Sequence, residues 1–383
     1  MKSGKSKRVF VAMSGGVDSS VSAALLKKRG FDVVGVYMKQ WFPKVLGKEC
    51  LWKQERQDAM RVASKLGIKF LTWDFSRDYE KQVGKYMIEA YKRGITPNPD
   101  VMCNKVIKFG LFFDKAIKSG ADFVATGHYV STSLGNKLFS ASGYPLLPFG
   151  QVDPELQKVY CLAFVKNSLP RSVKLLKAKD KNKDQTYFLW TLKQKHLAKT
   201  LFPVGNYTKP EVRKLAQKFG LHVALKKDSQ GVCFIGPLDM KNFLKSYIKP
   251  KKGKILSLDK KVIGEHDGVY YYTIGQRHGL DIKDGKGPYF IVKTDVKKNI
   301  IYVGKENDLY SKKAKIKNIN WIEKPKKFPV AVDVRIRYRG SLAKAKIYKS
   351  GNLIFLKPVK AITPGQSAVF YSRQQVLGGG VIT

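Results

Sequence analysis

The sequence contains little cysteine and no long apolar run, and both shortages exclude classes of protein. Four cysteines in 383 residues are too few and too scattered for a disulfide scaffold, and no two have the Cys-x-x-Cys spacing of a zinc site. Apolar runs stay short of the roughly eighteen residues that a membrane span needs. The brief apolar stretch after the basic residues 1–8 also argues against a signal peptide. These features predict a protein of a reducing compartment, the cytoplasm.

Acidic residues are scarce as well. The 29 Asp and Glu residues face 73 Lys and Arg residues, which leaves a formal net charge of +44. Residues 1–250 carry 45 basic and 19 acidic side chains, and residues 251–383 carry 28 and 10. Part of this excess is general lysine enrichment on solvated surfaces, but its spread suits a large polyanion that lies across several domains. The charge therefore favours a nucleic-acid partner.

The segment 14–20, Ser-Gly-Gly-Val-Asp-Ser-Ser, follows a strand-like apolar run at 9–13 and precedes a helical pattern at 21–28. A glycine-rich turn between a strand and a helix presents backbone N–H groups to an anion. The serine hydroxyls add donors, and Asp18 is placed to help hold Mg²⁺. The Gly-Lys-Ser/Thr of a Walker A loop is missing. The segment instead resembles the pyrophosphate loop (PP-loop) of ATP pyrophosphatases, which cleave ATP to AMP and pyrophosphate; a purely structural Gly-Gly turn is the alternative.

Strand and helix patterns alternate over the first part of the chain. This alternation predicts an α/β fold, a doubly wound parallel sheet with helices on both faces, whose ligands bind at the carboxyl ends of the strands. Thr208 and Glu211 form a capping box for a later helix at 208–219. Strands are expected at 9–13, 32–38, 68–75 and 123–127, and helices at 21–28, 54–66, 79–93 and 105–119.

After about residue 240, short runs rich in Val, Ile and Tyr alternate with glycine-containing turns, which predicts an all-β region ending in a small barrel. Strands are expected at 269–274, 289–293, 300–303, 330–338, 342–348 and 368–371. We expect three domains: a catalytic domain at 1–236, a small, mostly β central domain at 237–307 and a C-terminal β-barrel at 308–383. Within the first, residues 136–182 are expected to form an insertion at the surface.

Two cysteines stand in unusual contexts. Cys103 follows a proline-punctuated loop and begins a helix, where the helix dipole and Lys105 should stabilise its thiolate. Asp100, three residues earlier, is close enough to exchange protons with a bound group. Cys233 lies among basic residues and small loop formers at 226–236. Taken singly, each cysteine is typical of a buried structural residue; together, beside an ATP-activating loop, they suggest sulfur chemistry, although the spacing does not show that they meet.

With these segments the chain resembles the tRNA-specific 2-thiouridylases, whose PP-loop domain is of the adenine nucleotide α-hydrolase type. The matching segments are 12–20, 96–105, 125–129, 182–189, 201–205, 227–236, 264–268, 273–277, 363–371 and 377–380. The resemblance implies a sulfurtransferase that uses ATP and Mg²⁺ to adenylate the 2-carbonyl oxygen of the wobble uridine. Sulfur from a cysteine persulfide then displaces AMP and gives 2-thiouridine.

The resemblance also implies residue roles. Cys233 would carry the persulfide, Cys103 would be the nucleophile that completes the transfer, and Asp100 the acid/base residue. ATP would be bound by Ala12, Met13, Ser14, Gly15, Gly16, Val17, Asp18, Ser19, Met38 and Gly127. Asn98, Pro99 and Asp100 would contact the target base, and His128, Lys183, Asp184, Gln185, Arg337, Tyr338 and Gln366 the rest of the tRNA.

The implied partners are tRNA, with glutamate, glutamine and lysine acceptors expected, and a sulfur donor protein, either a cysteine desulfurase or a relay protein. The enzyme is expected to be a monomer. Some of these residues also have a purely structural interpretation. His128 would be a loop histidine whose hydrogen bonds are made within the protein, Arg337 and Tyr338 would lie on a solvated face of the barrel, and Gln366 would be a turn residue. Cys50 and Cys161 match no motif.

Two other functions compete. One is a PP-loop enzyme that adenylates a small carbonyl substrate and uses ammonia, which requires neither Cys103 nor Cys233. The other is a catalytically silent RNA-binding protein, against which the intact PP-loop, Asp100 and both cysteines argue.

Overall fold

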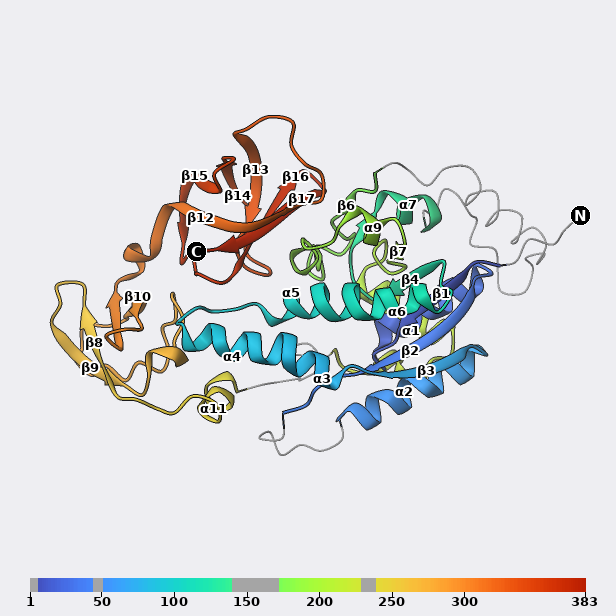
Figure 1. Cartoon of the computed structure of the whole chain (residues 1–383), viewed down its shortest axis with the longest axis horizontal. Helices are drawn as coiled ribbons and strands as arrows, with labels where there is room; N and C mark the ends of the chain where they lie inside the picture. The colour runs from blue at the N-terminus through green and yellow to red at the C-terminus, as the bar shows by residue number, and fades with distance from the viewer. Residues whose placement is uncertain (1–5, 44–50, 140–171, 229–238) are drawn as a thin grey trace, which may run out of the picture.

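The computed structural model describes residues 6–43, 51–139, 172–228 and 239–383. Figure 1 shows a sheet with its helices, a C-terminal barrel and a separate β region, the last connected to the sheet by the long helical stretch that contains α4. None of the helices in these ranges is both long and apolar enough to cross a bilayer.

The first domain contains a five-stranded parallel sheet in the order β3-β2-β1-β4-β7. The central strands β1 and β2 are buried along nearly their whole length because helices cover both faces. This arrangement confirms the predicted doubly wound α/β fold. The strands are β1 (Arg8–Ala12), β2 (Asp32–Lys39), β3 (Lys69–Asp74), β4 (Phe123–Thr126) and β7 (Thr200–Leu201).

One face of the sheet packs against α1 (Val17–Lys28), α2 (Leu51–Leu66) and α10 (Lys209–Lys218) in a single apolar core. The predicted capping box at the start of α10 is present: the Glu211 carboxylate accepts a hydrogen bond from the Thr208 N–H at 2.6 Å. The other face packs against two helical rods. Their segments are α3 (Ser76–Tyr79), η2 (Glu80–Gly84) and α4 (Lys85–Lys92), and then α5 (Pro99–Cys103), η3 (Asn104–Phe112) and α6 (Phe113–Lys118).

The second rod begins six residues before the predicted helix at 105–119. Asn98 is its N-cap and accepts a hydrogen bond from the Val101 N–H at 3.1 Å, and Pro99 occupies the first helical position. The fixed φ of proline suits that position, so the cluster 97–99 starts a helix where the sequence suggested a loop. Cys103 therefore lies inside the helix, one turn from its start.

The central region forms a four-stranded sheet in the order β10-β11-β8-β9. Its core contains side chains of α11 and also Met87, Ile88 and Tyr91 of α4, so a helix of the catalytic domain is part of its hydrophobic centre. The strand expected at 269–274 is wrong: a 3₁₀ turn, η6 (Val269–Tyr271), lies there, and Val269, Tyr271 and Tyr272 are buried in the core of this region. The elements are α11 (Met240–Lys245), β8 (Gly253–Ser257), β9 (Val262–His266), β10 (Phe290–Asp295) and β11 (Ile300–Gly304).

The C-terminal region is a closed six-stranded barrel, as predicted. Its order is β12-β15-β14-β13-β16-β17, and pairing of β12 with β17 closes it. The strands are β12 (Tyr310–Trp321), β13 (Val330–Arg335), β14 (Ala343–Ile347), β15 (Asn352–Lys360), β16 (Ser367–Ser372) and β17 (Gln375–Ile382).

The barrel is joined to the catalytic domain through strand pairing. β17 pairs with β6 (Leu175–Leu176), which pairs with β5 (Ser131–Thr132). Val173 and Leu175 are buried in the catalytic core. The expected surface insertion at 136–182 is thus wrong for residues 173–176, while residues 140–171 lie outside the described residues. The remaining helices are α7 (Ser133–Phe139), η4 (Thr186–Phe188), α9 (Gln194–Leu197), η5 (His222–Leu225) and η7 (Glu306–Leu309).

Candidate active site

The PP-loop lies at the carboxyl edge of the sheet, between β1 and α1. The Met13 N–H donates to the Val36 carbonyl at 2.8 Å and fixes the loop to β2. The Ser14 N–H donates to the Ser19 hydroxyl at 3.1 Å, and the Ser20 hydroxyl donates to the Gly16 carbonyl at 2.8 Å. These bonds hold the loop in a compact turn at the positive end of α1, the geometry that an oxyanion requires.

Two glycines let this loop pack closely. Gly15 has φ +74°, and a Cβ there would lie 2.2 Å from the Glu55 carbonyl oxygen. A Cβ on Gly127 would lie 2.6 Å from the Ser19 nitrogen, so the end of β4 rests directly on the PP-loop. Met38, at the end of β2, is buried at the same edge. The structure therefore brings the residues predicted to bind ATP together, although they come from three strands.

Asp18 is held by two donors. Its Oδ1 accepts hydrogen bonds from the Tyr129 hydroxyl at 2.7 Å and from Lys209 Nζ at 2.6 Å. Across the described ranges, no three His, Cys, Asp or Glu side chains are grouped as a metal site. Mg²⁺ in nucleotide sites is commonly bound by one or two carboxylates together with substrate phosphates. Asp18 fits a site of this carboxylate-and-phosphate type, in which the phosphates of ATP complete the coordination of Mg²⁺.

Asp228 connects the PP-loop with the segment that contains Cys233. It binds three cations: Lys209 at 2.9 Å, Arg213 at 3.0 Å, and Lys183. Burial would raise the pKa of the Asp228 carboxyl, but hydrogen bonds from Lys183 and Lys209 dominate and hold it at about 2. Lys209 bridges Asp18 and Asp228, so the residue that precedes 229–238 is tied to the nucleotide loop. Cys233 itself lies outside the described residues.

Cys103 is fully buried on the inner side of its helix. Its Sγ lies 4.0 Å from Gln40 Oε1, just beyond the end of β2. Burial raises the pKa of this thiol to about 12; Lys108 lowers it and Asp100 raises it. The expected stabilisation of the thiolate by Lys105 is wrong in this conformation, because Lys105 is exposed and burial outweighs the nearby charge. The thiol is therefore neutral here.

His128 lies inside the protein, only 7% exposed. Its Nδ1 is 2.7 Å from the Thr126 hydroxyl, and its Nε2 is 3.4 Å from Lys108 Nζ. Burial, and then the charge of Lys108, hold the pKa of His128 well below its ordinary value. A neutral ring accepts a hydrogen bond from Lys108, so in this conformation His128 positions that lysine and does not face a bound RNA.

The loop expected to contact the target base lies where all three regions meet. The Thr96 N–H donates to the Pro364 carbonyl of the barrel at 3.1 Å, and the Thr96 hydroxyl is 3.1 Å from that of Thr273 in the central region. Gln366 Nε2 donates to the carbonyls of Thr96 and Pro97 at 3.0 and 3.1 Å. The position of Asn98, Pro99 and Asp100 thus depends on both downstream regions.

Comparisons with known proteins agree with this organisation. Family models match residues 7–237 (tRNA methyl transferase HUP domain), 241–305 (tRNA methyl transferase PRC-barrel domain) and 311–382 (aminomethyltransferase beta-barrel domain). The tRNA-specific 2-thiouridylase MnmA of Halalkalibacterium halodurans is 41% identical, and that of Geobacillus thermodenitrificans 42%; each match covers 98% of this chain and 94% of the relative. The chain belongs to the tRNA-specific 2-thiouridylase family. Among solved structures, an NMN synthetase from Francisella tularensis covers 58% of this chain and 66% of its own, at 15% identity and a TM-score of 0.31, too weak a likeness to bear on function.

In this 2-thiouridylase family member, several residues expected to contact tRNA bind other parts of the protein. Asp184 is 4% exposed and pairs with Arg335 of the barrel at 3.0 Å. Gln185 Oε1 accepts a hydrogen bond from the Tyr129 N–H at 2.9 Å. Asp184 therefore holds the catalytic domain against the barrel, and Gln185 fixes the backbone of Tyr129, shortly after the end of β4.

The barrel residues have mixed surroundings. Arg337 is exposed overall, yet its Nη2 donates to the carbonyls of Ile274 and Ala361 at 3.3 and 3.1 Å. The ring of Tyr338 lies 4.4 Å from that of Phe188. Both residues stay predicted tRNA contacts, and both also connect regions of the chain.

Sequence reasoning missed Lys209, Arg213, Asp228, Tyr129 and Lys108. Tyr129 and Asp228 stand inside the segments 125–129 and 227–236 that carried the resemblance, so their neighbourhood was identified but not their role. Lys209 follows the capping residue of α10, a position where a lysine is ordinarily exposed to solvent. Its burial, with a side chain 10% exposed, is visible only in the fold.

Proposed function

We propose that this 2-thiouridylase family member uses ATP to adenylate the 2-carbonyl oxygen of the wobble uridine of tRNA and replaces that oxygen by sulfur. One observation carries the proposal: the PP-loop and Cys103 lie at the carboxyl ends of the neighbouring strands β1 and β2. A nucleotide phosphate at the loop and a sulfur nucleophile beside Gln40 would therefore act at the same edge of the sheet.

The loop supports cleavage between the α and β phosphates. Its backbone N–H groups and serine hydroxyls would hold the pyrophosphate that leaves, and Lys209 adds a positive charge next to Asp18. Mg²⁺ bound by Asp18 and the phosphates would neutralise further negative charge. The α phosphate is then left free for attack by the uridine oxygen.

Adenylation solves a chemical problem. A uridine carbonyl is a poor electrophile and oxide a poor leaving group, whereas an adenylated oxygen departs as part of AMP. The outer sulfur of a persulfide on Cys233 attacks C2, and the C2–O bond breaks. Cys103 then attacks the inner sulfur, which releases 2-thiouridine and leaves a Cys103–Cys233 disulfide. Both cysteines are oxidised, so a thiol reductant is needed for each further turnover.

The burial of Cys103 sets a condition on this scheme. A neutral thiol with a pKa of about 12 is a weak nucleophile, so the α5 turn or its cover must move before the transfer. Asp100 lies in the same turn and would receive the thiol proton or act on the base. Gln366 of the barrel and Thr273 of the central region form hydrogen bonds with Thr96, in the loop that precedes the α5 turn. A tRNA that binds the barrel and the central region would therefore act on the α5 turn through these hydrogen bonds.

The finer partners are part of the proposal. Glutamate, glutamine and lysine tRNAs are the expected substrates, a cysteine desulfurase or relay protein would load Cys233, and the enzyme would work as a cytoplasmic monomer. The words "methyl transferase" in the matching family models suggest a second reaction. A PP-loop with two cysteine contexts favours the thiolation chemistry of the named relatives.

ATP should be split only between its α and β phosphates. With labelled ATP, Mg²⁺, tRNA, a cysteine desulfurase with cysteine and a thiol reductant, we expect AMP and pyrophosphate in equal amounts, because no Walker lysine is present to direct attack at the γ phosphate. Omitting tRNA is the control and should stop turnover. Release of ADP and inorganic phosphate alone would overturn the proposed adenylation.

A further inference from the structure

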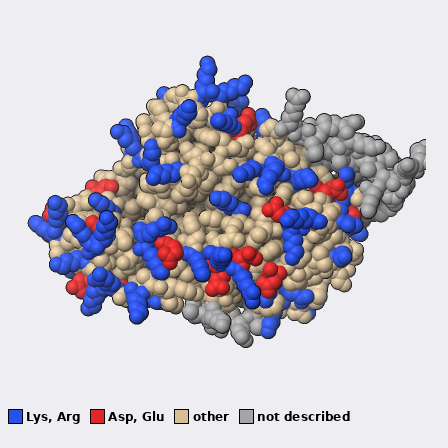
Figure 2. Space-filling view, viewed as in Figure 1, with Lys and Arg blue, Asp and Glu red and all other residues tan. Residues whose placement is uncertain are grey.

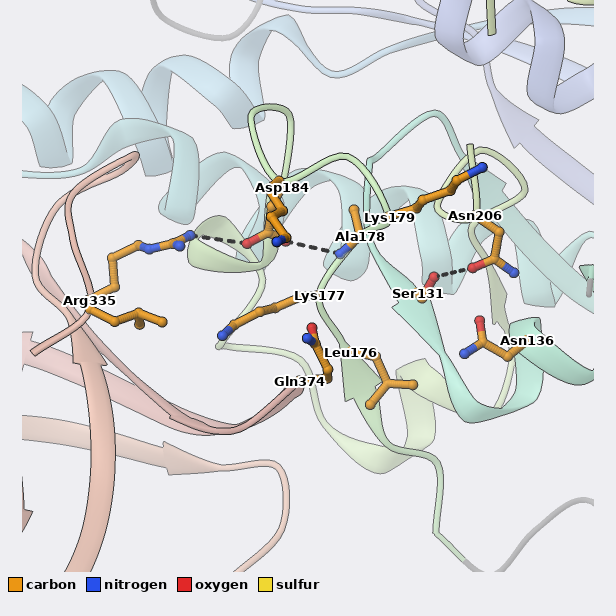
Figure 3. A pocket seen from close by; sticks show the side chains of 12 residues that line it. Ser131, Asn136, Leu176, Lys177, Ala178, Lys179, Asp184, Asn206, Arg335 and Gln374 are labelled. Carbon is orange, nitrogen blue, oxygen red and sulfur yellow. Dashed lines mark hydrogen bonds and ion pairs between the residues drawn. The ribbon is translucent and has the colours of Figure 1, made fainter. Parts of the chain in front are cut away.

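A cavity of about 630 Å³ lies between the catalytic domain and the barrel, and none of its wall residues belongs to the PP-loop. Figure 3 shows Arg335 on one side of the cavity and the amides of Asn136 and Asn206 on the other, with Lys177, Gln374, Leu176 and Ala178 between them. Its walls are formed by Ser131, Asn136, Leu176, Lys177, Ala178, Lys179, Lys181, Asp184, Asn206, Arg335, Leu342 and Gln374. Lys181 and Leu342 are exposed, so the cavity opens to solvent. Its volume is that of a pocket for a small ligand.

Positive charge is in excess in this cavity. Four of its wall residues are lysine or arginine, and Asp184 is the only carboxylate among them. Lys179 is paired with Glu211 at 2.7 Å, and Arg335 with Asp184. Lys177 donates instead to the Arg373 carbonyl at 2.8 Å, and burial, followed by the charge of Arg335, lowers its pKa. An anion in the cavity would relieve this repulsion.

Two buried polar atoms of the wall have no hydrogen-bond partner among the residues that the structure describes. Arg335 Nε is a donor at the cationic end, and its Nη1 is already engaged by Asp184. Asn136 Oδ1 is an acceptor at the other end, near the hydrogen-bonded pair Ser131 and Asn206. Buried groups of this kind usually have a partner, so both point to a ligand with an acceptor at one end and a donor at the other.

We propose that this cavity binds one nucleotide of the tRNA chain, with its phosphate at Lys177, Lys181 and Arg335 and its ribose or base at Asn136 and Asn206. The proposal rests on the tRNA substrate proposed above and adds a contact to it. None of the five residues lies in a segment that carried the family resemblance. The cavity does adjoin the segment 182–189, because Asp184 belongs to that segment and is also a wall residue of the cavity.

An RNA phosphate is favoured over a free nucleotide for two reasons. The rim is exposed, so a continuous chain can enter and leave. The protein surface is basic as well: on the face drawn in Figure 2, Lys and Arg side chains lie over all regions and outnumber Asp and Glu. Such a surface attracts a polyanion along its length, whereas a free nucleotide would need only the cavity.

The test measures tRNA affinity at several salt concentrations for Lys181→Met and for the double variant Lys177→Met/Lys181→Met. We expect the double variant to bind about tenfold more weakly and its salt slope to be shallower by about 1, as for one lost phosphate contact. Lys69→Met is the matched control: it removes one exposed lysine at the amino end of β3, at the edge of the sheet opposite to the PP-loop. Its affinity and slope should equal those of the wild type.

Each other outcome is decisive. Unchanged affinity and slope in the double variant would overturn the proposal, and the exposed Lys181 allows this test even if Lys177→Met disturbs folding. Binding of inorganic phosphate or AMP that is lost in the double variant, with tRNA affinity retained, would assign the cavity to a free anion and also overturn it. Failure of the wild type to bind tRNA would instead refute the proposed function.

Discussion

Cys103→Ser should reduce 2-thiouridine formation by at least about 10³-fold, because serine cannot attack the inner sulfur and release the product. The two side chains differ little in size, and Cys103 is fully buried, so the helix that begins at Pro99 should be retained. The variant should still accept sulfur on Cys233 and adenylate tRNA. Nucleoside mass analysis measures the product, and mass analysis of the protein measures the persulfide.

Cys233→Ser should give an equal loss that differs in one intermediate: adenylation continues, as in Cys103→Ser, but no persulfide forms. Cys50→Ser and Cys161→Ser are the controls and should retain thiolation. A Cys103→Ser/Cys233→Ser double variant that still makes 2-thiouridine from a protein-borne persulfide would refute the two-cysteine mechanism.

Asp18→Asn should lower pyrophosphate release by on the order of 100-fold or more, while tRNA affinity stays near that of the wild type. Asparagine keeps the shape of the side chain and can still accept the hydrogen bonds of Tyr129 and Lys209. What disappears is the negative charge that would hold Mg²⁺ on the phosphates and balance Lys209.

Asp32→Asn provides a matched control for this change. Asp32 pairs with Arg8 at 2.6 Å at the amino end of β2, so the same substitution there alters an ion pair on the opposite edge of the sheet. This control should retain activity. Wild-type ATP turnover in Asp18→Asn would show that the PP-loop does not use this carboxylate.

The sequence predicted the parts of the fold that depend on local pattern. The strands around the PP-loop alternate with helical patterns, and Thr208 with Glu211 caps one of these helices. The prediction from sequence was wrong at Pro99, where a proline starts a helix, and at Val269, where burial in a shared core imposes a 3₁₀ turn. Local propensity is overridden at such places by packing against distant segments.

The candidate site divides in the same way. Ser14 to Ser20 and Gly127 were found because their chemistry is written in short segments. Lys209 was not found, because it meets Asp18 across 191 residues of sequence. The burial of Asp184 and His128 could not be predicted either. It depends on how the barrel packs against Asp184 and on how the chain after β4 packs around His128. Short segments thus indicate which residues matter, and only the fold shows which of them touch.

The most direct test of the account is the nucleoside composition of tRNA after reaction with the wild-type protein. Unmodified tRNA would be incubated with the protein, ATP, Mg²⁺, a cysteine desulfurase with cysteine as the persulfide donor and a thiol reductant, digested to nucleosides and analysed by mass spectrometry. The account predicts 2-thiouridine at the wobble position, formed only when ATP is present. Unmodified or methylated uridine at that position, from protein that binds both ATP and tRNA, would contradict it.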